Sequence, residues 1–198
     1  MFGSPVDLLK KRWKAIFLFS ILIAFLSAFV TLFFPLKYRS NSQVYIISQN
    51  RYGVDPYTNV KSAEKVGENL IQVIRTTDFY GKVKNEDNSI DWSYFESSTE
   101  KKKREKWLKT LEANMVYGTS VMNINIYHPK PEEAKKISEA VAKTLVAKSW
   151  EYVGGDITIK IINTPILSSY PVKPNFILNA FFGFLIALFF SGLWTIKK

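Results

Sequence analysis

Two long apolar runs stand near the ends of the chain. Residues 15–36 and residues 176–196 contain no charged side chain, and neither run carries a polar stripe. Each is long enough to cross a bilayer core, which needs about 20 helical residues. The first run exceeds the roughly 7–15 apolar residues of a signal peptide, and no small-residue cleavage site follows it. We therefore predict two transmembrane helices, the first an uncleaved anchor.

Flanking charge predicts how these helices are oriented. Four basic residues precede the first run and two follow the second, whereas Lys37 and Arg39 lie on the other side of the first run. Positive residues that flank a membrane span favour the cytoplasmic side. The prediction is a cytoplasmic basic tail at 1–14, a cytoplasmic tail at 197–198 and an extracytoplasmic segment at 37–175. The six flanking residues are Lys10, Lys11, Arg12, Lys14, Lys197 and Lys198.

The segment between the runs alternates strand and helix patterns. Residues 38–47 are rich in Tyr and β-branched residues, which predicts a strand. Apolar residues then recur every three or four positions over 56–79, which predicts one helix with an apolar face. Further predicted elements are a polar helix over 94–111, strands over 113–117, 121–127 and 157–162, a helix from Pro131 to Gly154, and a Pro-rich linker over 164–175.

This order of elements predicts the fold class. Helices packed on one sheet are the economical way to bury these faces, so we expect an α+β protein in which two transmembrane helices flank a mixed α/β extracytoplasmic domain. If the first and last strands are neighbours in the sheet, the two membrane helices leave the domain side by side.

Composition narrows the chemistry. The chain has 198 residues, no Cys and one His, so disulfides, thiolate metal sites and cysteine nucleophiles are excluded. The net charge of +10 points to anionic partners. Part of this charge lies in the tails, where it sets topology and suits membrane lipids. No nucleic-acid module is present, and the middle segment is expected outside the cytoplasm, so we expect no nucleic-acid partner.

No catalytic, cofactor-binding or metal-binding residues stand out. The carboxylate pairs Asp87/Asp91 and Glu132/Glu133 lie in a polar loop and at a helix start, where solvation and the helix dipole explain them. His128 is expected in a loop. We therefore predict a protein that is not an enzyme.

A basic run offers a possible contact for an anionic polymer. It comprises Lys101, Lys102, Lys103 and Arg104. The alternative reading is a solvated helix face, in which these charges alternate with Glu100 and Glu105.

Residues near the second apolar run could couple the domain to the membrane. Pro165, Pro171, Pro174 and Asn175 form a candidate hinge, or simply an exposed linker. Within the run, small or polar side chains favour close helix packing and interhelical hydrogen bonds. These are Asn179, Gly183 and Gly192.

Several of these motifs, taken in order, resemble one family. A basic tail enters the first apolar run, Pro35-Leu36-Lys37-Tyr38-Arg39-Ser40 leaves it, and a strand follows. The strand over 121–127 leads into Pro131-Glu132-Glu133-Ala134, and Pro171-Val172-Lys173-Pro174-Asn175 precedes the second run. The chain resembles the polysaccharide co-polymerases, or Wzz-type chain-length determinants, including capsule-type membrane adaptor subunits.

The resemblance implies a function and partners. Such a protein would be a non-enzymatic scaffold that forms a homo-oligomeric ring and regulates the chain length, polymerisation or export of O-antigen, capsule or exopolysaccharide. A Wzy-type polymerase and the growing polysaccharide would be its partners, at the bacterial plasma (inner) membrane. The alternative is a membrane adaptor that activates a separate cytoplasmic tyrosine kinase.

Overall fold

The computed structural model describes residues 5–48, 55–96, 99–154 and 157–197. The chain divides into two compact units. One, here called the helix unit, comprises Met1–Leu36 and Val172–Lys198, and the other, the sheet unit, comprises Lys37–Pro171. The fold class is α+β, with a four-stranded sheet and an apolar helix toward each end of the chain, as predicted.

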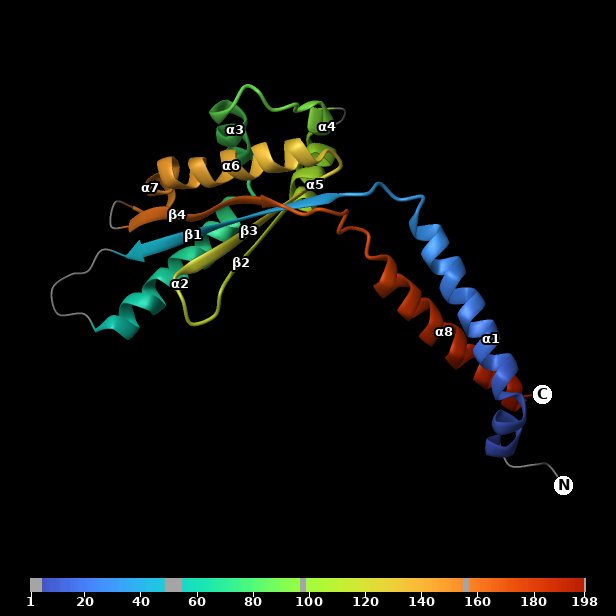
Figure 1. Ribbon diagram of the computed structural model, residues 1–198. Coiled ribbons are helices and arrows are strands. Elements are labelled where there is room, and N and C mark those ends of the chain that lie inside the picture. The colour runs from blue at the N-terminus through green and yellow to red at the C-terminus, as the bar shows by residue number, and fades with distance from the viewer. Residues whose placement is uncertain (1–4, 49–54, 97–98, 155–156, 198) are drawn as a thin grey trace. The chain divides into compact units, whose positions relative to one another are not determined.

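The helix unit consists of α1 (Pro5–Thr31) and α8 (Phe176–Lys197), which pack along each other (Figure 1). Both are long and apolar enough to cross a membrane. The first apolar run was predicted to be helical to residue 36, but α1 ends at Thr31. Residues 32–34 form tighter turns, in which Leu32 N–H donates to the Phe29 carbonyl at 3.0 Å. Pro35 explains this end, because proline disfavours helical backbone in the residue before it.

The sheet unit is built on an antiparallel sheet with the strand order β2-β3-β1-β4. Its strands are β1 (Tyr38–Ser48), β2 (Leu111–Met115), β3 (Val121–His128) and β4 (Ile157–Leu167). The first and last strands are neighbours, with Ser40 opposite Leu167. The two ends of this unit that continue toward α1 and α8 therefore lie side by side, as the sequence analysis expected.

The single helix predicted over 56–79 is wrong. The structure has α2 (Pro56–Val73) and α3 (Thr77–Glu86) instead. Thr76 separates them, since its Oγ1 accepts a hydrogen bond from Phe79 N–H and thus caps α3. Gly81 lies inside α3.

Two further boundaries differ from the prediction. The helix expected over 94–111 is replaced by α4 (Ser93–Glu96) and α5 (Glu100–Thr110), and the strand expected over 113–117 begins two residues earlier, at Leu111. The helix predicted from Pro131 runs as α6 (Pro131–Lys148), followed by the short α7 (Trp150–Val153). Gly154 ends α7 with a φ of 84°, a conformation that glycine adopts readily.

The last strand is longer than predicted. β4 continues to Leu167, so the linker expected over 164–175 begins only after that residue. Pro165 lies within β4, where the register against β1 is irregular between Asn41 and Gln43. An edge strand with a bulge tolerates proline, because its missing N–H breaks no regular ladder bond.

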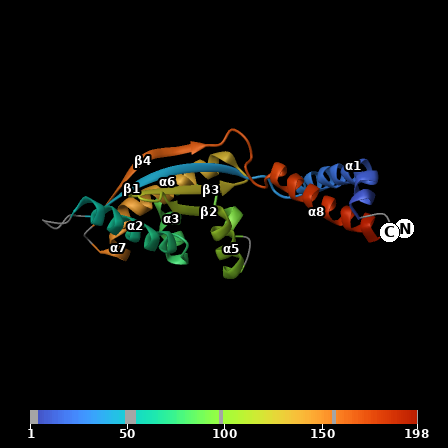
Figure 2. The same cartoon turned by 90° about the horizontal axis from the view of Figure 1, so that it is seen from below.

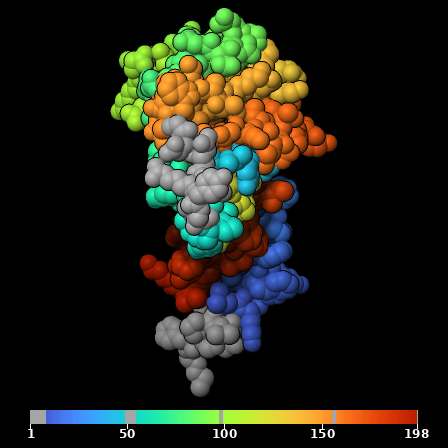
Figure 3. Space-filling view, turned by 90° about the vertical axis from the view of Figure 1, so that its left-hand side faces the viewer, coloured from blue at the N-terminus to red at the C-terminus, as the bar shows by residue number. Residues whose placement is uncertain are grey.

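The helices cover one face of the sheet. Even-numbered residues of β1 and β3, such as Val44 and Ile124, are buried beneath them. α6 reaches this face where Ser138 Oγ lies 3.1 Å from Ser42 Oγ, and α2 reaches it at Ile46. Figure 2 shows the strands side by side with helices along them, and Figure 3 shows α6, in orange, between green helical residues and β4. The opposite face of the sheet carries the odd-numbered residues of β1 and β3.

Candidate functional site

The contact between α1 and α8 contains a small polar network. Ser27 Oγ donates to the Asn179 carbonyl at 2.9 Å, and Asn179 Nδ2 donates to Thr31 Oγ1 at 3.1 Å. Thr31 Oγ1 in turn donates to the Ser27 carbonyl at 2.8 Å. In an apolar solvent such groups must find partners within the protein. Asn179 was singled out from the sequence for this kind of bond, whereas Ser27 and Thr31 were not.

Gly183 lies one turn from Asn179 at the same contact. A Cβ at this position would lie 2.7 Å from Ser27 Cβ, so glycine is what allows the helices to approach so closely here. Gly192 differs, since a Cβ there would meet only Leu9 Cδ2, at an ordinary 3.8 Å. Phe17 and Phe184 add an edge-to-face contact with ring centroids 5.7 Å apart. Close packing of the two helices therefore needs glycine at 183 but not at 192.

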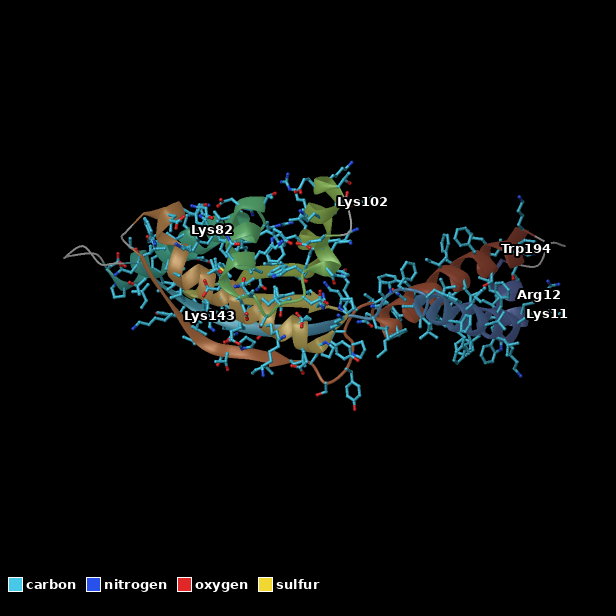
Figure 4. All side chains as sticks on the ribbon, turned by 90° about the horizontal axis from the view of Figure 1, so that it is seen from above. Lys11, Arg12, Lys82, Lys102, Lys143 and Trp194 are labelled. Atoms are coloured by element: carbon cyan, nitrogen blue, oxygen red, sulfur yellow. The ribbon has the colours of Figure 1, made fainter. Side chains whose placement is uncertain are left out.

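The outer surface of this helix pair is almost wholly apolar. Leu18, Phe25 and Ile177 are 73%, 73% and 84% exposed. In water this surface would be costly, whereas lipid tails are as apolar as the side chains themselves. Figure 4 shows Lys11 and Arg12 of α1 at the same end of the pair as Trp194 of α8. Basic and Trp side chains at one end are typical of helices that stop at a membrane–water interface.

The candidate hinge residues fall into different structural settings. Pro165 belongs to β4, Pro171 is the last residue of the sheet unit, and Pro174 belongs to the helix unit and follows a cis peptide bond. Asn175 precedes α8, and its Oδ1 accepts from Leu178 N–H at 3.0 Å. Asn175 thus caps α8. A hinge role for these residues remains a prediction.

The basic run lies on α5. Lys103 pairs with Glu100 at 2.8 Å, whereas Lys101, Lys102 and Arg104 are exposed. Lys102 points away from the sheet unit in Figure 4. The helix therefore has an exposed basic face, which suits solvent as well as an anionic ligand.

Three of the four carboxylates considered for catalysis have structural partners. Asp91 accepts from Lys130 Nζ at 2.7 Å, and this contact lowers the pKa of Asp91 well below its usual value. Glu133 is nearly buried and accepts from Asp91 N–H at 2.8 Å, while Asp87 accepts from Ser89 N–H. Across residues 5–48, 55–96, 99–154 and 157–197, no three His, Asp or Glu side chains gather as a metal site would need.

His128 is not the loop residue that the sequence suggested. It ends β3, is 2% exposed and packs edge-on against Tyr94, with ring centroids 4.8 Å apart. Its Nδ1 accepts from Lys130 N–H at 3.1 Å. Burial lowers the pKa of His128, because the charged ring would lose its hydration.

The face of the sheet opposite the helices carries a ladder of amide side chains that the sequence analysis did not identify as a site. In one row across all four strands, each residue lies opposite the next: Asn114, Asn123, Gln43 and Asn163. Gln43 Nε2 donates to Asn123 Oδ1 at 2.6 Å, and Asn163 Nδ2 donates to Gln43 Oε1. In the next row Asn41 Nδ2 donates to Asn125 Oδ1 at 2.9 Å. We call these six residues the amide face.

A shallow depression borders the amide face. It has a volume of about 460 Å³ and is lined by Arg39, Asn41, Asn123, Asn125 and Ile166, among others. Tyr127 lies beside Arg39 in the register, and it bonds Glu112 and Arg39. The alternation of Arg39, Asn41, Gln43 and Tyr45, matched by Asn123, Asn125 and Tyr127, was the sequence signal for this surface.

Fold and surfaces together define a class: an α+β domain set between two apolar helices. The model of the Wzz family, described as chain length determinant protein, matches residues 6–86, from α1 to the end of α3. This match confirms the resemblance seen in the sequence. A search of curated proteins gives no match. The matched part, 81 of the 198 residues, is similar to a family whose members are described as chain length determinant proteins.

Proposed function

We propose that this protein is a membrane scaffold that oligomerises and regulates the chain length, polymerisation or export of a cell-surface polysaccharide. The observation that carries the proposal is the family match over residues 6–86, which covers the first apolar helix and the strand that follows it. The exposed apolar surface of α1 and α8 supports membrane anchoring. Asp91, Glu133 and His128 are engaged in structural hydrogen bonds, which favours a role in which the protein makes or breaks no covalent bond.

In this proposal α1 and α8 cross the membrane, both termini are cytoplasmic, and residues 37–175 lie outside. The absence of native Cys makes this testable with single cysteines. A membrane-impermeant maleimide should label Tyr117→Cys in intact spheroplasts, since Tyr117 is 87% exposed in the sheet unit. Lys11→Cys should react only after lysis. The reverse pattern would overturn this topology.

The scaffold acts as a homo-oligomeric ring that holds a Wzy-type polymerase or the growing chain. The ring places many identical sheet units beside one polymer, so length is set by geometry. Mass photometry of the protein in lipid nanodiscs tests this. We expect one defined oligomer, and a monomer at all protein concentrations would contradict the proposal.

The activity itself is tested on the polymer. Deleting the gene should change the length distribution of the surface polysaccharide on a gel, and the intact chain supplied from a plasmid should restore it. Loss of all polymer would instead point to an essential synthetic step, and an unchanged distribution would remove the proposed function.

An adaptor for a separate tyrosine kinase is the second candidate. Its support is the basic end of the helix pair, where Lys11 and Arg12 lie at the same end as Trp194 (Figure 4). Replacing Lys197 and Lys198 by Glu should then reduce phosphorylation of the kinase. Unchanged phosphorylation in this variant counts against the adaptor.

A further inference from the structure

The amide face has an unusual combination of order and exposure. Five of its six side chains, all except Asn114, are linked by hydrogen bonds across the strands, and none of the six is fully buried. Each of these five amides is therefore held in one orientation, while part of its hydrogen-bonding capacity faces outward. An amide has two N–H donors and an oxygen that accepts twice, so one bond does not exhaust it. Among the residues that the structure describes, Nδ2 of Asn123 and of Asn125 has no protein partner.

The spacing of these groups is regular. Neighbouring strands lie about 4.8 Å apart, so a row across four strands extends over about 14 Å. A second row, Asn125 beside Asn41, runs parallel to the first and leads into the depression of about 460 Å³. That volume lies within the usual range of ligand sites. The result is a two-row lattice of fixed donors and acceptors beside a shallow hollow.

The charge of this surface selects the kind of ligand. The six amides are neutral. Arg39 and Glu112 carry opposite charges and both bond Tyr127, while the exposed Lys160 lies beyond the amide rows, opposite Tyr45. An anionic polymer would gain little here, whereas it would be attracted by Lys101, Lys102 and Arg104 on α5. Hydroxyl groups both donate and accept, as amides do. The surface therefore complements an uncharged, hydroxyl-rich chain.

A second copy of the protein fits this surface less well. The centres of protein–protein interfaces are enriched in aromatic and apolar side chains. Here the central positions of the sheet, Gln43, Asn123 and Asn125, are amides. Larger side chains flank these amides: Tyr45 follows Gln43 along β1, and Ile166 lies on the edge strand β4, at 40% and 67% exposure.

We propose that the amide face is a binding surface for neutral, hydroxyl-rich sugar units of a polysaccharide. This inference rests on the proposed function, because it supplies the surface along which the regulated polymer would be held. Binding would be weak at each sugar and would add up over several units in an oligomer.

The test uses the full chain in nanodiscs and oligosaccharides cut from the surface polysaccharide of its own host by mild hydrolysis. Binding is measured by isothermal titration calorimetry. The double variant Asn123→Leu/Asn125→Leu should weaken binding about tenfold, because two donors are lost. The matched control is Gln72→Leu, an exposed amide on α2, which should change binding less than about twofold.

Further variants keep the test decisive. Asn163→Leu on the edge strand should weaken binding even if the double variant fails to fold. Lys101→Glu/Lys102→Glu should leave binding intact. If instead the α5 variant abolishes binding and the amide variants retain it, the basic run is the site and the proposal is wrong. If the amide variants change the oligomer mass but not sugar binding, a second copy covers the face, which also overturns it.

Failure of this inference is separable from failure of the proposed function. If wild-type protein binds no oligosaccharide while deletion of the gene still alters polymer length, only the sugar surface is refuted. If deletion leaves polymer length unchanged, the proposed function falls first.

Discussion

The helix unit and the sheet unit place the same kinds of side chain in opposite ways. Trp107 of the sheet unit is 1% exposed and donates to the Ile74 carbonyl at 2.9 Å, whereas Trp194 of the helix unit is 72% exposed. Polar side chains are also placed in opposite ways in the two units. Ser27 and Thr31 face the contact between α1 and α8, while the amides of the sheet unit face outward. The difference indicates that the two units fold against different solvents.

The largest effect should come from removing a buried Trp. Trp107→Ala takes away a side chain packed against Tyr80 and Phe95 and should lower the free energy of unfolding of the sheet unit by about 3–5 kcal/mol. Urea unfolding of the full chain in detergent, followed by circular dichroism, measures this. Trp194→Ala is the control and should leave the sheet unit unchanged. If both variants lowered the stability of the sheet unit equally, the proposed difference between the two units would be contradicted.

A new charge should also separate the units. Leu185 of α8 and Val146 of α6 are each 42% exposed, so they are matched positions. Leu185→Lys should make membrane insertion of α8 less favourable by about 3 kcal/mol. A glycosylation reporter carrying residues 176–196, diluted with polar residues until half of it inserts, measures this.

Val146→Lys faces water and should change the free energy of unfolding by less than about 0.5 kcal/mol. If Leu185→Lys changes the free energy of insertion as little as Val146→Lys changes the free energy of unfolding, then α8 does not lie in lipid.

Two glycines of α8 provide a test of how closely α1 packs on this helix. Gly183→Val should cost about 1–3 kcal/mol of helix association, because the added carbons meet Ser27, whereas Gly192→Val should be nearly neutral. The readout is cross-linking by a short bifunctional thiol reagent between Phe17→Cys and Phe184→Cys, whose parent rings touch. We expect less intramolecular product with Gly183→Val only. Equal yields for both glycine variants would show that Gly183 has no special role.

The smallest effect concerns pH and belongs to the sheet unit alone. The pKa of His128 is lowered by burial from its usual 6.5, so the unfolded chain takes up a proton at a higher pH than the folded chain does. The free energy of unfolding should therefore fall as pH drops below about 6.5. Because His128 is the only His, its NMR signal is unambiguous.

The signal of His128 should titrate below pH 6.5. His128→Asn should reduce the shift of the urea midpoint between pH 7.5 and pH 5.5. A titration above pH 6.5 would show that the ring is solvated or paired with an acid.

The sequence predicted the apolar helices and the strands well, because their signals are local. Residues 15–36 and 176–196 lack charge, and Asn123 and Asn125 alternate with apolar neighbours in β3. The sequence did not predict helix boundaries that depend on a single capping contact. Thr76 divides the helix predicted over 56–79 through one bond to Phe79 N–H, and apolar periodicity does not reveal such a contact. The end of β4 also depended on pairing with β1, which tolerates Pro165 at an irregular register.

The surfaces were harder to predict than the elements. Gly183 and Asn179 were identified because glycine and asparagine stand out in an apolar run, but Ser27 and Thr31 became significant only once α1 packed on α8. The amide face needs β2, β3, β1 and β4 in register, which no single strand encodes. The amide face therefore depends on long-range strand pairing, although each strand contributes one or two of its amide side chains.

The most direct test of the account is the length distribution of the surface polysaccharide, measured by size-exclusion chromatography with light scattering. Three strains are compared: wild type, a deletion, and the deletion supplied with the intact chain at its normal level. We predict that deletion alters the mean length or broadens the distribution, that total polymer stays within about twofold, and that the intact chain restores the original lengths. Identical distributions in all three strains would contradict the account.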